Sequence, residues 1–169
     1  MKKIRIGQIG TLHDHSSMTM LSLRKMTDIF EVVGYVPESE ERYLEIKDSN
    51  AFRGLPAMTT EELLDASIDA AVIEGFEKRL VPDAMMCVKR GIHVHIDKPA
   101  GEDIDEFKQL LDLAKENDSV VQMGYMYRYN PAVKKALEIV KSGRLGEIYS
   151  VEAQMNCLHT LEKQRWLVQ

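Results

Sequence analysis

The sequence predicts an α/β fold built on a doubly wound parallel sheet, followed by the first helix and strand of a second, α+β domain. Two observations predict the sheet: apolar segments of four to six residues alternate with helical segments, and this order persists from residue 4 to residue 123. Strands joined by helices pair in parallel, and the helices cover both faces. A third observation, strict alternation of apolar and polar residues near the end of the chain, predicts the second sheet.

The expected strands are short and apolar, as strands buried on both faces are. They are Ile4–Ile9, Glu31–Val36, Asp69–Ile73, His93–Ile96 and Val120–Met123. The helices expected between them are Ser16–Met26, Ser39–Lys47, a short helix from Thr59 through Leu64, Val81–Arg90 and Asp103–Glu116. Thr59 precedes acidic residues, which is typical of a helix N-cap and first turn. Gly91 stands where a glycine ends a helix.

Beyond residue 124 the pattern changes, and we place a domain boundary there, between residues 1–124 and residues 125–169. Pro131 suits the first position of a helix, which we expect to reach Lys141. The segment Gly146–Asn156 then alternates like a strand with one wet face. Because a lone strand is not stable, we expect this segment to pair with another copy or to be disordered. The chain is expected to stop inside this second domain, which would serve substrate binding or oligomerisation.

Composition excludes several classes of protein. The 169 residues are 44% hydrophobic and 29% charged, which is normal for a chain that buries a core. A net charge of −5 argues against nucleic acid and anionic membranes as partners. No apolar run approaches the roughly 20 residues of a membrane span, and no signal peptide is recognisable. Cys87 and Cys157 are expected to be reduced thiols of a cytoplasmic protein.

A tight turn follows the first strand, where Gly7 and Gly10 precede the segment Thr11–His15. Glycines permit such a turn, and the N-terminus of the next helix offers N–H groups to a pyrophosphate. A dinucleotide fingerprint would continue with further glycines, which are absent here. The alternative is an ordinary strand-to-helix turn with an N-cap.

Glu38 follows the second strand, where NAD-binding domains place an acid that accepts hydrogen bonds from the ribose. It fits a helix-start acid equally well. No arginine stands directly beside it for a 2′-phosphate, although Arg42 lies one helical turn further on. NAD is therefore favoured over NADP.

Two histidines in the glycine turn, His13 and His15, suggest a metal site. Zinc sites take three or four protein ligands, however, and two imidazoles are too few. His93 and His95 lie on another expected strand and are not expected to join them. We therefore expect no metal.

The strongest candidate for chemistry is the stretch Gly91–Gly101, in which a strand ends in Asp97 and Lys98, followed by Pro99. An acid and a base at the end of a strand, stiffened by proline, form a candidate pair for proton transfer. A salt-bridged surface turn is the alternative.

These residues resemble a known family. "GIHVHIDKPAG", followed by "VVQMGYMYRYNPAVKKALEIVKSGRLGEIYSVEAQ", is similar to the glucose-fructose oxidoreductase / inositol dehydrogenase / MocA (Gfo/Idh/MocA) family, in order and spacing along essentially the whole chain. The resemblance implies a Rossmann-type domain, NAD or NADP as cofactor, and oxidation or reduction of a hydroxyl or carbonyl group. The family's Glu-Lys-Pro reads Asp-Lys-Pro here, and its usual Thr-Pro-Asn-x-x-His is replaced by the segment Glu74–Leu80.

The resemblance also implies roles for single residues. Lys98 would be catalytic, binding substrate and assisting proton transfer. Arg128, with Tyr129 and Asn130, would lie near the nicotinamide or the domain junction. The residues expected to bind the cofactor are Gly7, Gly10, Thr11, His13, Glu38, Asp97 and Arg128.

The sequence thus predicts a truncated NAD(P)-dependent oxidoreductase acting on a sugar, cyclitol or similar small molecule. Its aspartate–histidine pair for catalysis would lie beyond Gln169. A homo-oligomer is expected. The alternative is a non-catalytic dinucleotide-binding or sensing module, which the altered turn favours.

Overall fold

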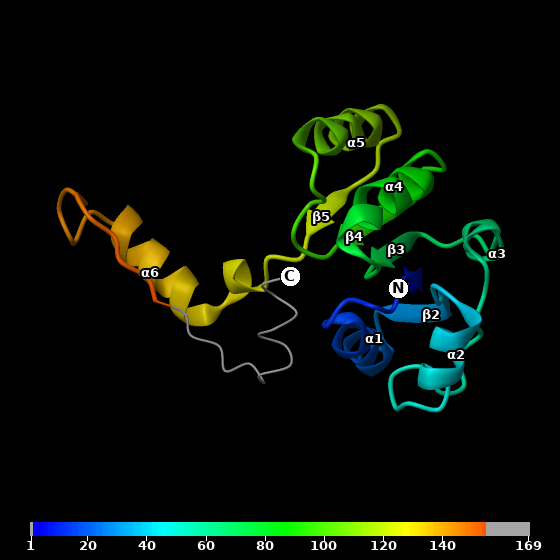
Figure 1. Cartoon of the computed structure of the whole chain (residues 1–169). Helices are drawn as coiled ribbons and strands as arrows, with labels where there is room; N and C mark the ends of the chain where they lie inside the picture. Colours follow the sequence, from blue (N-terminus) through cyan, green and yellow to red (C-terminus); the bar gives the residue numbers. More distant parts are fainter. Residues whose placement is uncertain (1, 155–169) are drawn as a thin grey trace, which may run out of the picture. The chain divides into compact units, whose positions relative to one another are not determined.

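A computed structural model describes residues 2–154, and the chain divides after Tyr125 into two compact units. The first unit contains a five-stranded sheet in the order β2-β1-β3-β4-β5, and every neighbouring pair is parallel (Figure 1). The expected doubly wound parallel sheet is confirmed. Its strands are β1 (Ile4–Ile9), β2 (Phe30–Val36), β3 (Ala70–Ile73), β4 (His93–Ile96) and β5 (Val121–Met123).

Five helices connect and follow these strands within the first unit: α1 (Ser16–Lys25), α2 (Glu40–Ile46), α3 (Thr60–Asp65), α4 (Glu77–Val88) and α5 (Ile104–Glu116). Most bounds lie close to those expected from the sequence. The exception is α4, which begins at Glu77, four residues before the expected Val81. Its first turns are held by the fully buried Leu80 and by an ion pair between Arg79 and Asp83. The helix therefore carries Pro82 inside it rather than near its start.

Helices cover both faces of the sheet. Leu23 of α1 packs on Ile6 and Val72, whereas buried residues of α3, α4 and α5 pack with Ala71 and Ile73. Adjacent residues of a strand face opposite sides. So α1 lies on one face and α3, α4 and α5 lie on the other; α4 and α5 run side by side near β4 and β5 (Figure 1).

The second unit begins with a 3₁₀ turn, η1 (Met126–Tyr129), and the helix α6 (Pro131–Lys141), which confirms the expected helix. The side chain of Asn130 caps this helix by accepting hydrogen bonds from the N–H groups of Ala132 and Val133. The expected strand Gly146–Asn156 is a wrong prediction for residues 146–154, which form no strand; residues 155 and 156 lie outside the described part. Alternation gives a segment two faces, but a strand needs a partner to accept its hydrogen bonds.

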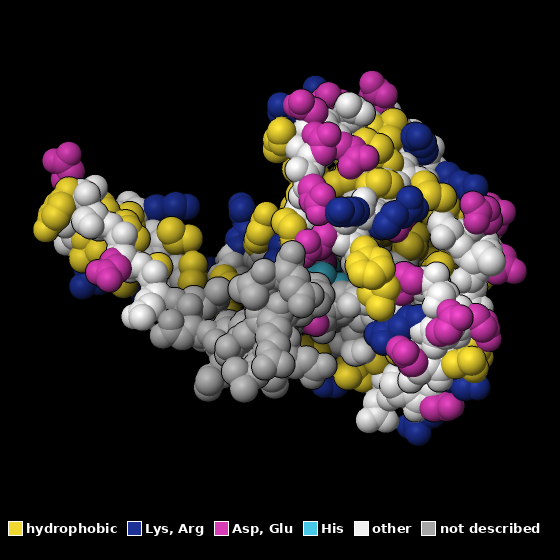
Figure 2. All heavy atoms as spheres, viewed as in Figure 1, with side chains coloured by type: hydrophobic (Ala, Val, Ile, Leu, Met, Phe, Trp, Pro, Cys, Tyr) yellow, Lys and Arg dark blue, Asp and Glu magenta, His cyan; other side chains and the backbone are white. Residues whose placement is uncertain are grey.

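The surface of the first unit mixes charges of both signs. Figure 2 shows Lys and Arg side chains interspersed with Asp and Glu side chains on the visible face of this unit. Within the described residues no helix has the length and apolar content needed to cross a membrane.

Candidate functional site

The candidate site lies at the carboxyl edge of the sheet, where the turns after β1, β3 and β4 meet. The strand order reverses between β1 and β3, and open parallel sheets bind ligands at such a point. Gly10 has φ +86°, and a Cβ there would lie 2.3 Å from the backbone nitrogen of Gly75. A Cβ on Gly7 would lie 2.5 Å from Cδ1 of the buried Leu63. Gly10 is thus required by the packing of the protein itself, whereas a Cβ on Gly7 would force the Leu63 side chain to move.

The turn after β1 holds a carboxylate. The N–H groups of Thr11 and Leu12 donate hydrogen bonds to Oε1 of Glu38, at 2.7 and 3.1 Å, and the Thr11 hydroxyl donates to Oε2 at 2.6 Å. Arg42 closes the arrangement, because its guanidinium donates to the Thr11 carbonyl oxygen at 2.7 Å. The partners of Glu38 have the donor chemistry that a phosphate group requires.

A second cluster joins this turn to the end of β4. Nδ1 of His13 lies 2.5 Å from Oδ2 of Asp97, and Nδ1 of His15 lies 2.8 Å from the same oxygen. The other Asp97 oxygen accepts a hydrogen bond of 2.7 Å from the backbone N–H of Lys98. The end of β3 adds Glu74, whose side chain is 1% exposed and whose Oε2 lies 3.7 Å from Nδ1 of His13.

The electrostatics of this cluster favour the protonated form of His13. The hydrogen bond to Asp97 outweighs burial and raises the pKa of His13. Burial alone would raise the pKa of Asp97, but the hydrogen bonds from His13 and from the Lys98 N–H hold that pKa well below its usual range. Burial, with the charge of Asp97, raises the pKa of Glu74 to about 7. The ammonium group of Lys98 is near enough to oppose protonation of His13.

The structure brings most of the predicted site residues together at this edge. Gly7 lies within β1, Gly10 and Thr11 form the turn after it, and Glu38 reaches this turn from the end of β2. His13 joins Asp97 and Lys98 at the end of β4. Arg128 lies in η1 of the second unit and is exposed, so its place near a cofactor stays a prediction.

Sequence reasoning gave no role in the site to three residues of this edge: His15, Arg42 and Glu74. The signal for Glu74 was available, because it directly follows the buried strand β3. His15 was noticed, but its partner Asp97 is 82 residues away in sequence. Two imidazoles alone are too few for a metal site, but the fold brings the carboxyl groups of Asp97 and Glu74 beside them.

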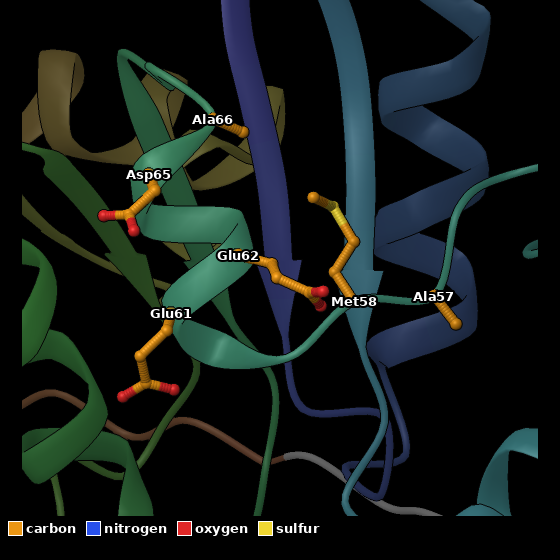
Figure 3. A pocket seen from close by; sticks show the side chains of 6 residues that line it. All are labelled: Ala57, Met58, Glu61, Glu62, Asp65 and Ala66. Carbon is orange, nitrogen blue, oxygen red and sulfur yellow. The ribbon is translucent and has the colours of Figure 1, made fainter.

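Two surface hollows lie elsewhere. One, of about 510 Å³, is lined by α3 and the segment before it. Figure 3 shows Glu62 extending from α3 toward the segment that carries Met58, while Glu61 and Asp65 point away from that segment. The other, of about 660 Å³, lies on the face that α1 covers and reaches the amino ends of β3 and β4, at Asp69 and His93. Neither hollow is lined by a residue of the carboxyl-edge cluster, which consists of His13, His15, Glu74 and Asp97.

Two curated dehydrogenases resemble this chain in sequence. The chain is 27% identical over 134 residues to the UDP-N-acetylglucosamine 3-dehydrogenase of Acidithiobacillus ferrooxidans, covering 79% of this chain and 41% of that protein. It is 23% identical to the myo-inositol 2-dehydrogenase of Thermotoga maritima, covering 85% of this chain and again 41% of the relative. The chain thus spans about two fifths of the length of these curated relatives.

Solved structures share the fold. The A. ferrooxidans enzyme superposes with a TM-score of 0.66 at 27% identity, over 82% of this chain and 44% of that one. The WlbA dehydrogenase of Bordetella pertussis, solved with NADH and UDP-GlcNAcA, gives a TM-score of 0.78 at 21% identity, over 88% of this chain and 42% of that one. The second likeness shows the fold alone.

One family description covers most of the chain. The sequence model described as an oxidoreductase family with an NAD-binding Rossmann fold matches residues 4–125, which include all five strands and the whole carboxyl-edge cluster. The chain therefore belongs to the Gfo/Idh/MocA family of oxidoreductases, of which it carries the NAD-binding Rossmann fold.

Proposed function

We propose that this chain is the cofactor-binding part of an NAD(P)-dependent oxidoreductase acting on a hydroxyl or carbonyl group of a sugar, cyclitol or similar small molecule. The observation that carries the proposal is the turn after β1. It holds an anionic carboxylate on two backbone N–H groups and a hydroxyl group, at the sheet edge where Lys98 also lies. Family membership and the dehydrogenase names of the relatives support the same reaction class.

The turn residues fit a dinucleotide. Thr11 and Leu12 would donate to a phosphate in place of the Glu38 carboxylate, and Glu38 would then be free to accept hydrogen bonds from a ribose. An acid in that role disfavours a 2′-phosphate, which supports NAD over NADP. When bound, the nicotinamide ring accepts or donates the hydride, and the chain itself supplies position and charge.

Lys98 is the residue proposed to manage the proton. Its ammonium group would hold a substrate oxygen and exchange a proton with it as that oxygen changes between hydroxyl and carbonyl. Asp97, fixed by His13 and by the Lys98 N–H, keeps the start of this turn in place. Arg128 is proposed to contact the cofactor.

The test compares Lys98→Met with Lys89→Met, a control at the C-cap of α4, in the whole protein. We expect Lys98→Met to reduce turnover by about 100-fold or more, as loss of a general acid–base group does, with NADH binding unchanged in a fluorescence titration. Lys89→Met should leave both unchanged. Full turnover in Lys98→Met would remove Lys98 from the mechanism, and absence of dinucleotide binding by the unmodified protein would refute the proposed function.

A second candidate is a non-catalytic dinucleotide-binding or sensing module. One observation favours it: the donors of the turn are already occupied by Glu38, and Gly10 is required by packing whether or not a cofactor binds. Tight NADH binding with no turnover of any polyol or sugar by the whole protein would support this candidate over the enzyme.

A further inference from the structure

Three side chains at the carboxyl edge form a ligand set that the dehydrogenase reaction does not require. The side chains of His13, His15 and Asp97 each offer a ligand atom, and these atoms lie within 4.8 Å of one another. The two imidazoles come from the turn after β1 and the carboxylate comes from the end of β4. Two imidazoles and a carboxylate are a ligand set typical of divalent transition metals in proteins.

The two imidazoles converge on one carboxylate oxygen. Both present Nδ1 to one carboxylate oxygen, Oδ2 of Asp97, at 2.5 and 2.8 Å. Nδ1 of His13 also lies 3.2 Å from the backbone N–H of His15, which needs a lone pair there. A proton on Nδ1 of His13 could be donated to Asp97, but it would prevent this nitrogen from accepting the hydrogen bond of the His15 N–H. A metal ion would be bound by the lone pairs of the two Nδ1 atoms and by the Asp97 carboxylate.

Glu74 gives a second and independent indication of a cation. Its side chain is 1% exposed, and neither carboxylate oxygen makes a hydrogen bond of normal geometry. Oε2 lies 3.7 Å from Nδ1 of His13 and so points into the cluster. A buried carboxyl group without a hydrogen bond is costly. A divalent ion bound by the neighbouring side chains would place an opposite charge beside Glu74.

We propose that His13, His15 and Asp97 bind a divalent transition-metal ion, with Glu74 beside it as a further carboxylate. The set suits Zn²⁺, and also Fe²⁺, Co²⁺ or Ni²⁺. The imidazoles are 10% and 29% exposed, so the ion can enter from solvent. Three protein ligands leave a coordination position for water or a substrate oxygen, which a divalent ion polarises as a Lewis acid.

The experiment uses the full chain after removal of metal with EDTA, and Co²⁺ as the probe. Visible absorption of Co²⁺ follows binding, and Zn²⁺ is then added as a competitor. We expect saturation at one ion per chain, displacement by Zn²⁺, and a raised melting temperature with Zn²⁺. His15→Gln should weaken binding at least about 100-fold, since loss of even an outer partner of a metal ligand costs 10- to 100-fold.

His95→Gln is the matched control, because His95 lies on β4 in contact with Gln122 and outside the cluster. It should bind Co²⁺ as the unmodified chain does. His13→Gln serves as a second cluster variant, and each variant is accepted only if its circular dichroism matches that of the unmodified chain. Absence of Co²⁺ binding, binding that persists in both cluster variants, or equal loss in His95→Gln would each overturn the proposal. The titration contains no dinucleotide, so failure of cofactor binding leaves it unaffected.

Discussion

At the scale of single residues, close contacts between turns decide at which positions of the carboxyl edge a side chain can replace a glycine. Gly10 combines a left-handed backbone with direct contact to the backbone of Gly75, whereas Gly54 has a similar φ of +78° and no atom within 4 Å of its missing Cβ. Alanine substitution at these two positions therefore separates the free-energy cost of the backbone conformation from that of a steric clash.

Gly10→Ala is expected to lower the free energy of unfolding by about 3 kcal/mol or more, since strain in the backbone adds to overpacking. Gly54→Ala should lose only about 1 kcal/mol, because conformation alone is affected. Urea unfolding followed by circular dichroism measures both. Equal losses would show that the turns after β1 and β3 are not in the close contact described.

Cys87 provides a prediction about pH. It is fully buried in α4, and burial raises the pKa of its thiol to about 12. In a Cys157→Ser variant, Cys87 should stay unreactive toward a thiol reagent at pH 8 and react fully after unfolding in urea. Because the folded pKa is the higher one, this thiol favours folding below its ordinary pKa of 9.0, and that contribution is lost as pH rises toward 12. Rapid labelling of the folded variant at pH 8 would contradict the burial.

At the scale of elements, α3 shows local sequence and structure in agreement. The Thr59 hydroxyl accepts a hydrogen bond of 3.2 Å from the Glu62 N–H, and the Glu62 carboxylate accepts one of 2.8 Å from the Thr59 N–H. This capping box was visible in the sequence as a threonine three residues before a glutamate.

Thr59→Ala is expected to cost about 1 kcal/mol of unfolding free energy, as loss of an N-cap does. Thr60→Ala, one residue on and without a capping bond, should stay within about 0.5 kcal/mol of the unmodified protein. Thermal unfolding compares the two. The Thr59 backbone hydrogen bond lowers the pKa of Glu62, so the contribution of Glu62 is present above pH 4.5 and is lost at lower pH. A larger loss in Thr60→Ala would refute the assigned cap.

At the scale of the whole molecule, the buried hydrophobic core belongs to the first unit. Its three clusters of buried residues run from Ile6 to Ala114, and α6 of the second unit has no buried residue in the described chain. A unit with its own core can fold alone. The homo-oligomer expected from the sequence stays a prediction.

A chain ending at Tyr125 should therefore unfold cooperatively, with a free energy within about 1 kcal/mol of that of the full chain. Urea unfolding with two probes, circular dichroism and tyrosine fluorescence, measures this. Non-coincident transitions, or a large loss of stability, would show that residues 126–169 contribute to the core.

The sequence by itself determined the five strands, their parallel pairing through helical connections, the capped helices and the family. These features depend on periodicity and on neighbours within a few residues, which a sequence displays directly. The start of α4 was less predictable, because the burial of Leu80 and the ion pair of Asp83 are set by packing.

Tertiary structure alone decided what the carboxyl edge contains. Glu38 reaches Thr11 across 27 residues, and Asp97 reaches His15 across 82. No local pattern encodes such a contact, because it arises only when parallel strands bring their ends to one edge. The lone segment 146–154 shows the converse: its alternation is a local property, but a strand exists only with a partner to share its hydrogen bonds.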